Sequence, residues 1–221
     1  MQKIFDLAPT LCDGFPTHPK NNPVEIRASA EFERDGHRSE RLNITSHTGC
    51  HVDAPAHLVR DGRTIDAIPI EGFVGPGVVV DVRGKPPDAP ITVRDLEPAA
   101  ARIKPGVIVL LFTGWSRRRA ASDEYIHHSP YLAAEAAQWL VSRRIKGVGV
   151  DHFSVGTTER NRDRAAHLPL LEAGIWILED LDIPDELLCY TDLVLYAAPL
   201  KLANGSGAPA RPFAIAEIAD P

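Results

Sequence analysis

Cysteine is scarce in this chain. Cys12, Cys50 and Cys189 are too few and too widely spaced for a disulfide framework or a thiolate zinc site. Positive charge is not in excess either, because the net charge is -6, and this gives no basis for binding nucleic acid or an anionic membrane surface. No apolar run is long enough for a signal peptide or a membrane span. We therefore expect a cytoplasmic protein without nucleic-acid or membrane partners.

The composition is that of an ordinary folded domain. Hydrophobic residues make up 44% and charged residues 24% of the 221 residues. This length suffices for one domain with a substantial core, and no internal repeat, low-complexity tract or linker divides it. We therefore predict a single domain over residues 1–221.

Periodicity and capping signals predict an α/β fold. Strands are predicted in apolar, β-branched runs at 78–82, 107–112, 147–151 and 175–178. Helices are predicted at 92–103, from Ser129 and Pro130 to Arg144, and at 165–173. The order strand, helix, strand over 107–151 predicts a parallel β-α-β unit. We expect a mixed sheet with such units, flanked by helices.

The amino-terminal part is predicted to contain one strand, a proline-pinned segment and a hairpin. Four prolines fall within residues 1–24, which favours an extended surface segment after a short first strand. Asp35-Gly36 predicts a hairpin turn within residues 24–46. The second hairpin strand is expected to continue to His47.

Residues 47–57 hold the densest group of metal-binding side chains, three imidazoles and a carboxylate: His47, His51, Asp53 and His57. Divalent transition metals favour imidazole nitrogen together with carboxylate oxygen. On a helix His51 and Asp53 would point roughly 200° apart, but on a strand they share a face. Gly49 and Pro55 predict a bend followed by a restart. A knuckle of this kind can aim four polar side chains at one point.

The pattern H-x-G-x-H-x-D-x-P-x-H over residues 47–57 resembles the signature of the cyclase family, which includes bacterial kynurenine formamidases and isatin-hydrolase-like enzymes. His167 and Glu179 match a His and a Glu of the formamidases, although their spacing alone would not pair them; the isatin-hydrolase-like branch carries Gln at the second position. Blocks at 149–155 and 198–202 also match, so the resemblance extends from about Phe5 to Ala214. It implies the family's swivelling β/β/α-like fold.

The resemblance also implies a set of metal ligands and a proton shuttle. His47, His51 and Asp53 would hold a divalent ion, with zinc expected and manganese as the alternative. His167 and Glu179 would complete that site or bind a second ion, with Asp53 bridging. His57 would lie outside the ligand set and transfer the proton, because its ordinary pKa near 6.5 suits that role.

Three functions remain open at this stage. The first is arylformamidase-type hydrolysis of N-formylkynurenine to kynurenine and formate, a step of tryptophan degradation. The second is hydrolysis of another small molecule, either a cyclic amide or imide such as isatin or a lactone. The third is a non-catalytic protein with a structural metal, which the His/Asp composition and the spare His57 disfavour. Family members are dimers or tetramers, so a homodimer or homotetramer is expected.

Substrate contacts are expected from Phe15, Trp115 and Phe153. Phe15 belongs to the proline-rich segment, where the neighbouring His18 is either a second wall residue or a solvated side chain. Two loops depart from the formamidase pattern, at Gly156 and in the turn that begins at Gly205, and both are candidate determinants of specificity.

Overall fold

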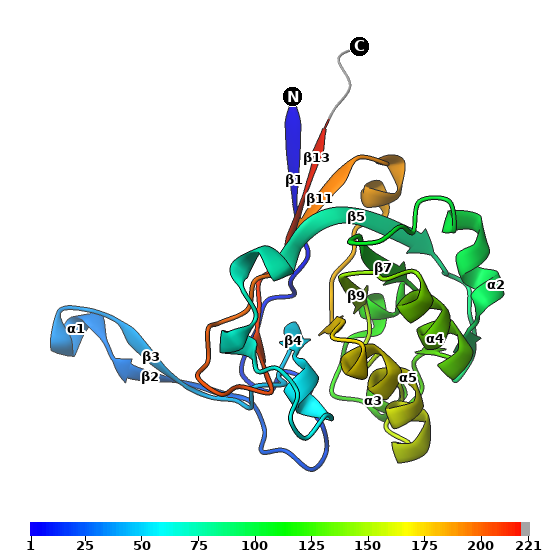
Figure 1. Cartoon of the computed structure of the whole chain (residues 1–221). Coiled ribbons are helices and arrows are strands. Elements are labelled where there is room, and N and C mark those ends of the chain that lie inside the picture. The colour runs from blue at the N-terminus through cyan, green and yellow to red at the C-terminus, as the bar shows by residue number, and fades with distance from the viewer. Residues whose placement is uncertain (218–221) are drawn as a thin grey trace.

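A computed structural model describes residues 1–217 of the chain, with the backbone alone for Arg160. Nine strands form one curved mixed sheet in the order β1-β13-β11-β5-β7-β9-β10-β4-β12 (Figure 1). In that order their bounds are Gln2–Asp6, Phe213–Glu217, Leu193–Tyr196, Val74–Asp81, Ile108–Phe112, Gly147–Val150, Trp176–Glu179, His51–Asp53 and Gly207–Pro209. The four strands β5, β7, β9 and β10 are parallel, and the remaining neighbours in this sheet pair antiparallel. The chain is a single α/β domain.

The central strands consist mostly of apolar residues, as expected for strands with both faces covered. Successive side chains of a strand point to opposite faces, so in β5 Val78 and Val80 enter one core and Val79 the other. All five residues of β7 are buried for the same reason.

Helices cover one face of the sheet, and the sheet curls over the other (Figure 1). The described α-helices are α1 to α5, at Phe32–Asp35, Val93–Leu96, Asp123–His127, Ala134–Ser142 and Arg160–Glu172, and of these α1 lies away from the sheet. Leu96 of α2, Leu140 of α4 and Leu170 of α5 pack into the first core. The second core joins residues of the outer strands, such as Phe5 of β1 and Val52 of β4. Among the described helices, none is both long and apolar enough to cross a membrane.

Two short strand pairs lie outside the large sheet. β6 (Pro90–Ile91) runs parallel to β8 (Tyr131–Leu132). β2 (Glu25–Ala30) pairs with β3 (Ser39–Asn43) to form a hairpin arm that projects from the body (Figure 1). This arm confirms the predicted hairpin, and its tip is the one-turn helix α1, ended by Gly36 at φ +73°.

The predicted β-α-β unit over 107–151 is confirmed as β7, α4 and β9. The helix start at Ser129 and Pro130 is wrong. Backbone N–H groups of Tyr131 and Leu132 donate to the carbonyls of Ala89 and Val155, which draws these residues into strand β8. The helix therefore begins at Ala134.

Three further boundaries differ from the predictions. The strand expected to reach His47 ends at Asn43, because β3 loses its partner where β2 begins. Thr92 and Asp95 do start a helix, with a capping box, but it ends at Leu96 and passes into a 3₁₀ turn at Glu97–Ala99. The helix predicted at 165–173 is longer and starts at residue 160, because Glu159 caps it by accepting hydrogen bonds from two backbone N–H groups.

Candidate metal centre

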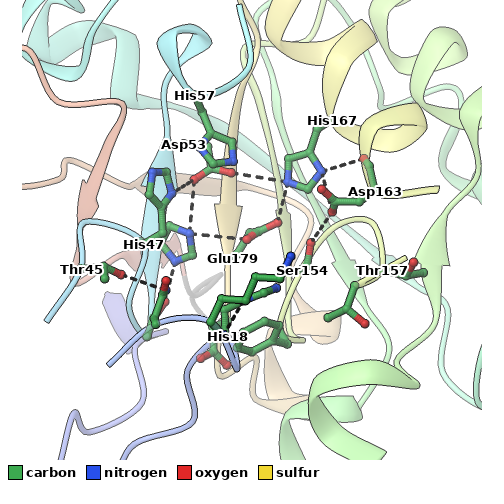
Figure 2. A pocket seen from close by; sticks show the side chains of 17 residues that line it. His18, Thr45, His47, Asp53, His57, Ser154, Thr157, Asp163, His167 and Glu179 are labelled. Atoms are coloured by element: carbon green, nitrogen blue, oxygen red, sulfur yellow. Dashed lines mark hydrogen bonds and ion pairs between the residues drawn. The ribbon is translucent and has the colours of Figure 1, made fainter. Parts of the chain in front are cut away.

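Strand pairing assembles the candidate centre. β4 lies between β10 and β12, and its register places Glu179 of β10 opposite His51 and Gly207 of β12 opposite Asp53. The turn before β4 supplies His47, and the 3₁₀ turn Pro55–His57 after it supplies His57. Helix α5 brings His167 to the same place (Figure 2).

Two buried carboxylates lie at the middle of this group. The Oδ1 atom of Asp53 lies 2.7 Å from Nδ1 of His47 and 3.2 Å from Nε2 of His51. Glu179 contacts two imidazoles, with Oε2 3.5 Å from Nε2 of His51 and Oε1 3.1 Å from Nε2 of His167. The structure thus brings together all five side chains that the sequence suggested as metal ligands.

Further hydrogen bonds orient these side chains. Nδ1 of His51 donates to the Gly49 carbonyl at 2.7 Å, and Nδ1 of His167 donates to the Asp163 carbonyl at 2.9 Å. In both rings Nε2 is left to face the carboxylates. The backbone N–H of Val155 donates to Oε1 of Glu179 at 2.7 Å. Partners of this kind fix the orientation and tautomer of metal-binding histidines.

The electrostatics of the group favour a bound cation. Burial opposes a charged imidazole, but the hydrogen bond to Asp53 and the charge of Glu179 outweigh it and raise the pKa of His51 to about 9. Burial similarly opposes the charge of His167, yet Asp163, Asp53 and Glu179 hold its pKa well above the ordinary value. Burial would raise the pKa of Asp53, but contacts with His167, His47 and His51 keep it well below its usual range. The two buried carboxylates stabilise positive charge nearby, and without a metal that charge is supplied by protons on His51 and His167.

One orphaned atom fits a metal ligand. Oδ2 of Asp53 is buried and has no hydrogen-bond partner among the described residues, and Nε2 of His167 at 3.5 Å is too distant to be one. An unpaired buried carboxylate oxygen is costly, and a divalent cation would satisfy it. Ligand atoms of His51, Asp53 and Glu179 lie within 4.8 Å of one another, as do those of His47, Asp53 and His57. The residues present therefore fit a divalent ion and leave room for a second.

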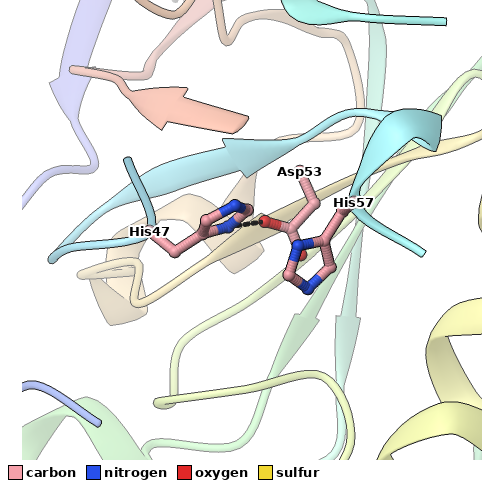
Figure 3. Close-up of side chains that lie close together, drawn as sticks. All are labelled: His47, Asp53 and His57. Atoms are coloured by element: carbon pink, nitrogen blue, oxygen red, sulfur yellow. Dashed lines mark hydrogen bonds and ion pairs between the residues drawn. The ribbon is translucent and has the colours of Figure 1, made fainter. Parts of the chain in front are cut away.

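His57 lies beside the carboxylate of Asp53 and the ring of His47 (Figure 3). Its ring centroid is 4.2 Å from that of His47. Burial lowers the pKa of His57, so its imidazole is neutral near pH 7 and can accept a proton. The same position puts His57 within reach of the ligand set, although the sequence suggested a place outside it.

A cavity of about 420 Å³ opens in front of the centre. Phe153 lines it, as the sequence suggested. Phe15 and Trp115 do not belong to its lining. Phe15 is buried beneath Gly49, and Trp115 is buried with its ring against the Arg118 guanidinium. Both side chains pack inside the protein instead of lining the cavity.

The structure gives specific contacts to residues that the sequence left without a defined role. Oγ of Ser206 lies 3.0 Å from Nε2 of His47, so the late turn orients a ligand candidate. Lys20 lines the cavity beside His18, which the sequence had offered as either a wall residue or a solvated side chain, and nothing in the spacing of Lys20 distinguished it from a solvated loop. Gly156 has a packing role, because a Cβ there would lie 2.6 Å from Cα of Asp163 in α5.

Comparisons with known proteins agree with this geometry. The model of a family described as "Putative cyclase" matches residues 5–157. The kynurenine formamidase of Bacillus cereus is 30% identical over 208 residues, which cover 94% of each chain. Isatin hydrolase A of Labrenzia aggregata has a TM-score of 0.85 at 31% identity, with 97% of this chain and 94% of that chain covered. A structure described as a potential metal-dependent hydrolase with cyclase activity has a TM-score of 0.78 at 29% identity, with 99% and 100% covered.

Proposed function

Because the chain belongs to the cyclase family, we propose that it is a metal-dependent hydrolase that cleaves the carbon–nitrogen bond of an N-formyl aryl amine. One observation carries this proposal: the buried Asp53 and Glu179 meet three imidazoles, and a neutral His57 lies beside them at the cavity. The substrate of the reaction is N-formylkynurenine, and the products are kynurenine and formate. The formamidase relative and the carboxylate at position 179 support this choice.

His47, His51 and Asp53 would hold the metal, with His167 and Glu179 completing the site or holding a second ion. Zinc is the expected ion and manganese the alternative, since both accept imidazole and carboxylate ligands. A divalent ion held by these residues would polarise a carbonyl and lower the pKa of a water molecule.

The side chains of the protein perform the proton transfers. His57 accepts a proton from the attacking water while the new carbon–oxygen bond forms at the formyl carbon. It then donates that proton to the amine nitrogen as the carbon–nitrogen bond breaks. The lowered pKa of His57 keeps the ring unprotonated before the first transfer. Ser206 and Gly49 hold the rings of His47 and His51 in place during both steps.

The test is turnover of N-formylkynurenine by the metal-loaded protein, with a chelator-treated sample as control. Isatin and a simple aryl ester are assayed in parallel. We expect rapid loss of the formyl group that the chelator abolishes. Metal binding without turnover of N-formylkynurenine would contradict the formamidase assignment.

Hydrolysis of a cyclic amide, imide or lactone is the second candidate function. The similarity to isatin hydrolase A over nearly the whole chain favours it. Faster turnover of isatin than of N-formylkynurenine would make this the correct assignment. A purely structural metal remains the third candidate, and chelator-sensitive turnover of any of these substrates would eliminate it.

We also propose that the chain forms a homodimer or homotetramer through the hairpin arm. An isolated two-stranded hairpin is marginally stable in water, so an arm that projects from the body requires a partner surface. Phe32 and Leu42 of the arm are 61% and 53% exposed, and a second copy would cover them. Light scattering should give a mass of at least two chains, and a monomer at all concentrations would contradict the proposal.

A further inference from the structure

The wall of the cavity opposite His57 is a turn formed by residues 18–21. Figure 2 shows His18 on the far side of the drawn cavity from His57 and Asp53. The turn closes through a hydrogen bond from the backbone N–H of Asn21 to the carbonyl of His18 at 2.8 Å. His18, Lys20 and Asn21 all contribute to the cavity lining. A substrate whose reactive bond lies at the metal centre would thus meet this turn with its other end.

His18 presents a hydrogen-bond donor to the cavity. Its Nδ1 accepts the backbone N–H of Lys20 at 3.1 Å, so the proton of the neutral ring is on Nε2. Burial and the charge of Lys20 lower the pKa of His18, which keeps the ring in this single neutral form near pH 7. The Nε2–H group is therefore available to a ligand acceptor.

Among the described residues that line the cavity, Lys20 carries the one charge outside the candidate metal centre that no ion pair compensates. Of the described side chains, it is the one Lys or Arg that lines the cavity, and no described carboxylate forms an ion pair with it. The nearby acidic groups are already engaged. Asp163 interacts with Ser154 and His167, and Asp180 pairs with Arg119.

The turn is tied to the segment that carries the metal-binding histidines. Nδ2 of Asn21 lies 3.5 Å from Oγ1 of Thr45, which in turn lies 3.0 Å from Oγ1 of Thr48. The backbone N–H of Thr45 donates to the same Thr48 oxygen at 3.0 Å. These contacts connect the turn to the segment that carries the metal-binding histidines. The distance between the turn and the metal centre is therefore fixed by the fold, and a substrate must have the matching length to reach both.

We propose that His18 and Lys20 form a subsite for a carboxylate at the end of the substrate remote from the scissile bond. The ammonium group of Lys20 and the imidazole N–H of His18 would each donate a hydrogen bond to one oxygen of such a group. Both bonds would be charge-assisted, because the carboxylate acceptor is ionised. The substrate is then an N-formyl aryl amine that bears an acid side chain, and an uncharged ring such as isatin leaves the subsite unused. The identity of the scissile bond in this inference rests on the proposed function, whereas the recognition of the carboxylate does not.

Kinetics with a matched substrate pair test the subsite. The first substrate is the carboxylic acid that corresponds to N-formylkynurenine without its α-amino group. The second is the primary amide of this acid, which has the same length and no charge. In the metal-loaded Lys20→Met enzyme, the ratio of kcat/KM for the acid to that for the amide should fall about tenfold, mainly through KM. The control Lys104→Met changes an exposed lysine outside the cavity lining and should keep the wild-type ratio. An unchanged ratio in Lys20→Met overturns the subsite.

A binding measurement separates this inference from the proposed function. Calorimetry follows the binding of the deaminated product acid and of its amide to the metal-loaded protein, and needs no turnover. Tighter binding of the acid by the wild type, lost in Lys20→Met and retained in Lys104→Met, supports the subsite even if no formyl compound is hydrolysed. Equal affinity of the wild type for acid and amide, or no binding of the acid, overturns it even if hydrolysis is fast.

Discussion

The Nδ1 atom of His51 lies 2.7 Å from the carbonyl oxygen of Gly49, and this contact sets which ring nitrogen faces the metal centre. Gly49 can place its carbonyl there because its backbone lies in the left-handed region, at φ +60°. The backbone conformation of Gly49 therefore determines the ring orientation of His51, two residues along the chain. The conformational freedom of this glycine serves to orient a candidate metal ligand.

Replacing Gly49 by Ala should weaken metal binding. The Cβ would lie 3.3 Å from Cδ1 of Leu11, and the left-handed conformation costs an L-residue roughly 1–2 kcal/mol. Movement of the carbonyl would release His51, and loss of such a partner lowers metal affinity on the order of tenfold. Gly36→Ala is the matched control, because Gly36 has φ +73° with open space around it on the hairpin arm. If both variants titrate with metal like the wild type, the orienting role of Gly49 is wrong.

Removal of the metal should destabilise the wild type and leave Asp53→Asn unaffected. A ligand at a hundred times its Kd stabilises a protein by about 2.7 kcal/mol, and Asp53 takes part in both ligand groups. Thermal unfolding with and without chelator measures the difference. Asp61→Asn, an exposed change nearby, should respond to the chelator like the wild type. A chelator effect of wild-type size in Asp53→Asn would place the metal elsewhere.

His57→Ala should abolish turnover while the protein keeps its metal. The lowered pKa of His57 suits a base, and general acid–base catalysis contributes roughly 10²–10⁴-fold to a rate. Metal content by atomic emission and kcat on N-formylkynurenine are measured on the same sample. Loss of one ion per chain together with activity would instead make His57 a ligand, as its closeness to His47 and Asp53 permits.

The part of the site that lies within one short segment could be predicted from the sequence. His51 and Asp53 are two residues apart, and the structure places both in the strand β4, as their spacing indicated. Glu179 could not be paired with them by spacing. It reaches His51 because β10 runs antiparallel to β4 in a register that sets these two residues opposite each other. Such a register depends on the packing of the whole sheet.

The cavity wall was harder to predict for a related reason. In the N-terminal segment Phe15 was expected to contact the substrate and His18 was either a wall residue or solvated, and only the contacts of the folded chain decide each case. Phe15 packs beneath Gly49, while the hydrogen bond from Lys20 turns His18 towards the cavity. The helix start predicted at Ser129 and Pro130 failed for the same reason. These residues have the local sequence of a helix start, but the pairing of Tyr131 with Pro90 places the following residues in a strand.

Arg119→Met should lower the stability of the fold through Asp180. Asp180 follows Glu179 directly, has φ +62°, and pairs with Nε of Arg119 at 3.0 Å in a nearly buried contact. Leaving that carboxylate without its cation costs about 3 kcal/mol, measurable by chemical denaturation. Arg117→Met removes an exposed ion pair and should change stability by less than about 0.5 kcal/mol. Equal effects of the two variants would show that Asp180 does not depend on Arg119.

The buried His152 should make the protein sensitive to mild acid. Neither of its ring nitrogens has a hydrogen-bond partner of ordinary geometry in the described part of the chain, and burial lowers its pKa to about 3 although the nearby backbone of Ser154 acts in the opposite direction. In the unfolded chain the pKa is about 6.5, so below that pH the unfolded state binds a proton that the folded state does not. Stability contributed by the neutral ring is complete above about pH 6.5 and is lost progressively as the pH falls towards about 3.

His152→Leu isolates this contribution. The difference in unfolding free energy between wild type and variant is measured without metal, so that the shared titration of the other histidines cancels. Near pH 7.5 the two proteins should agree within about 1 kcal/mol, because an apolar side chain of similar volume replaces a ring with no partners. By about pH 5 the wild type should have lost about 2 kcal/mol relative to the variant, since each pH unit below the unfolded pKa costs about 1.4 kcal/mol.

His37→Leu, a change on the exposed arm, serves as the control and should show no such difference. A wild type that tracks His152→Leu down to pH 5 would mean that the folded protein protonates His152, and that its ring has a polar partner after all.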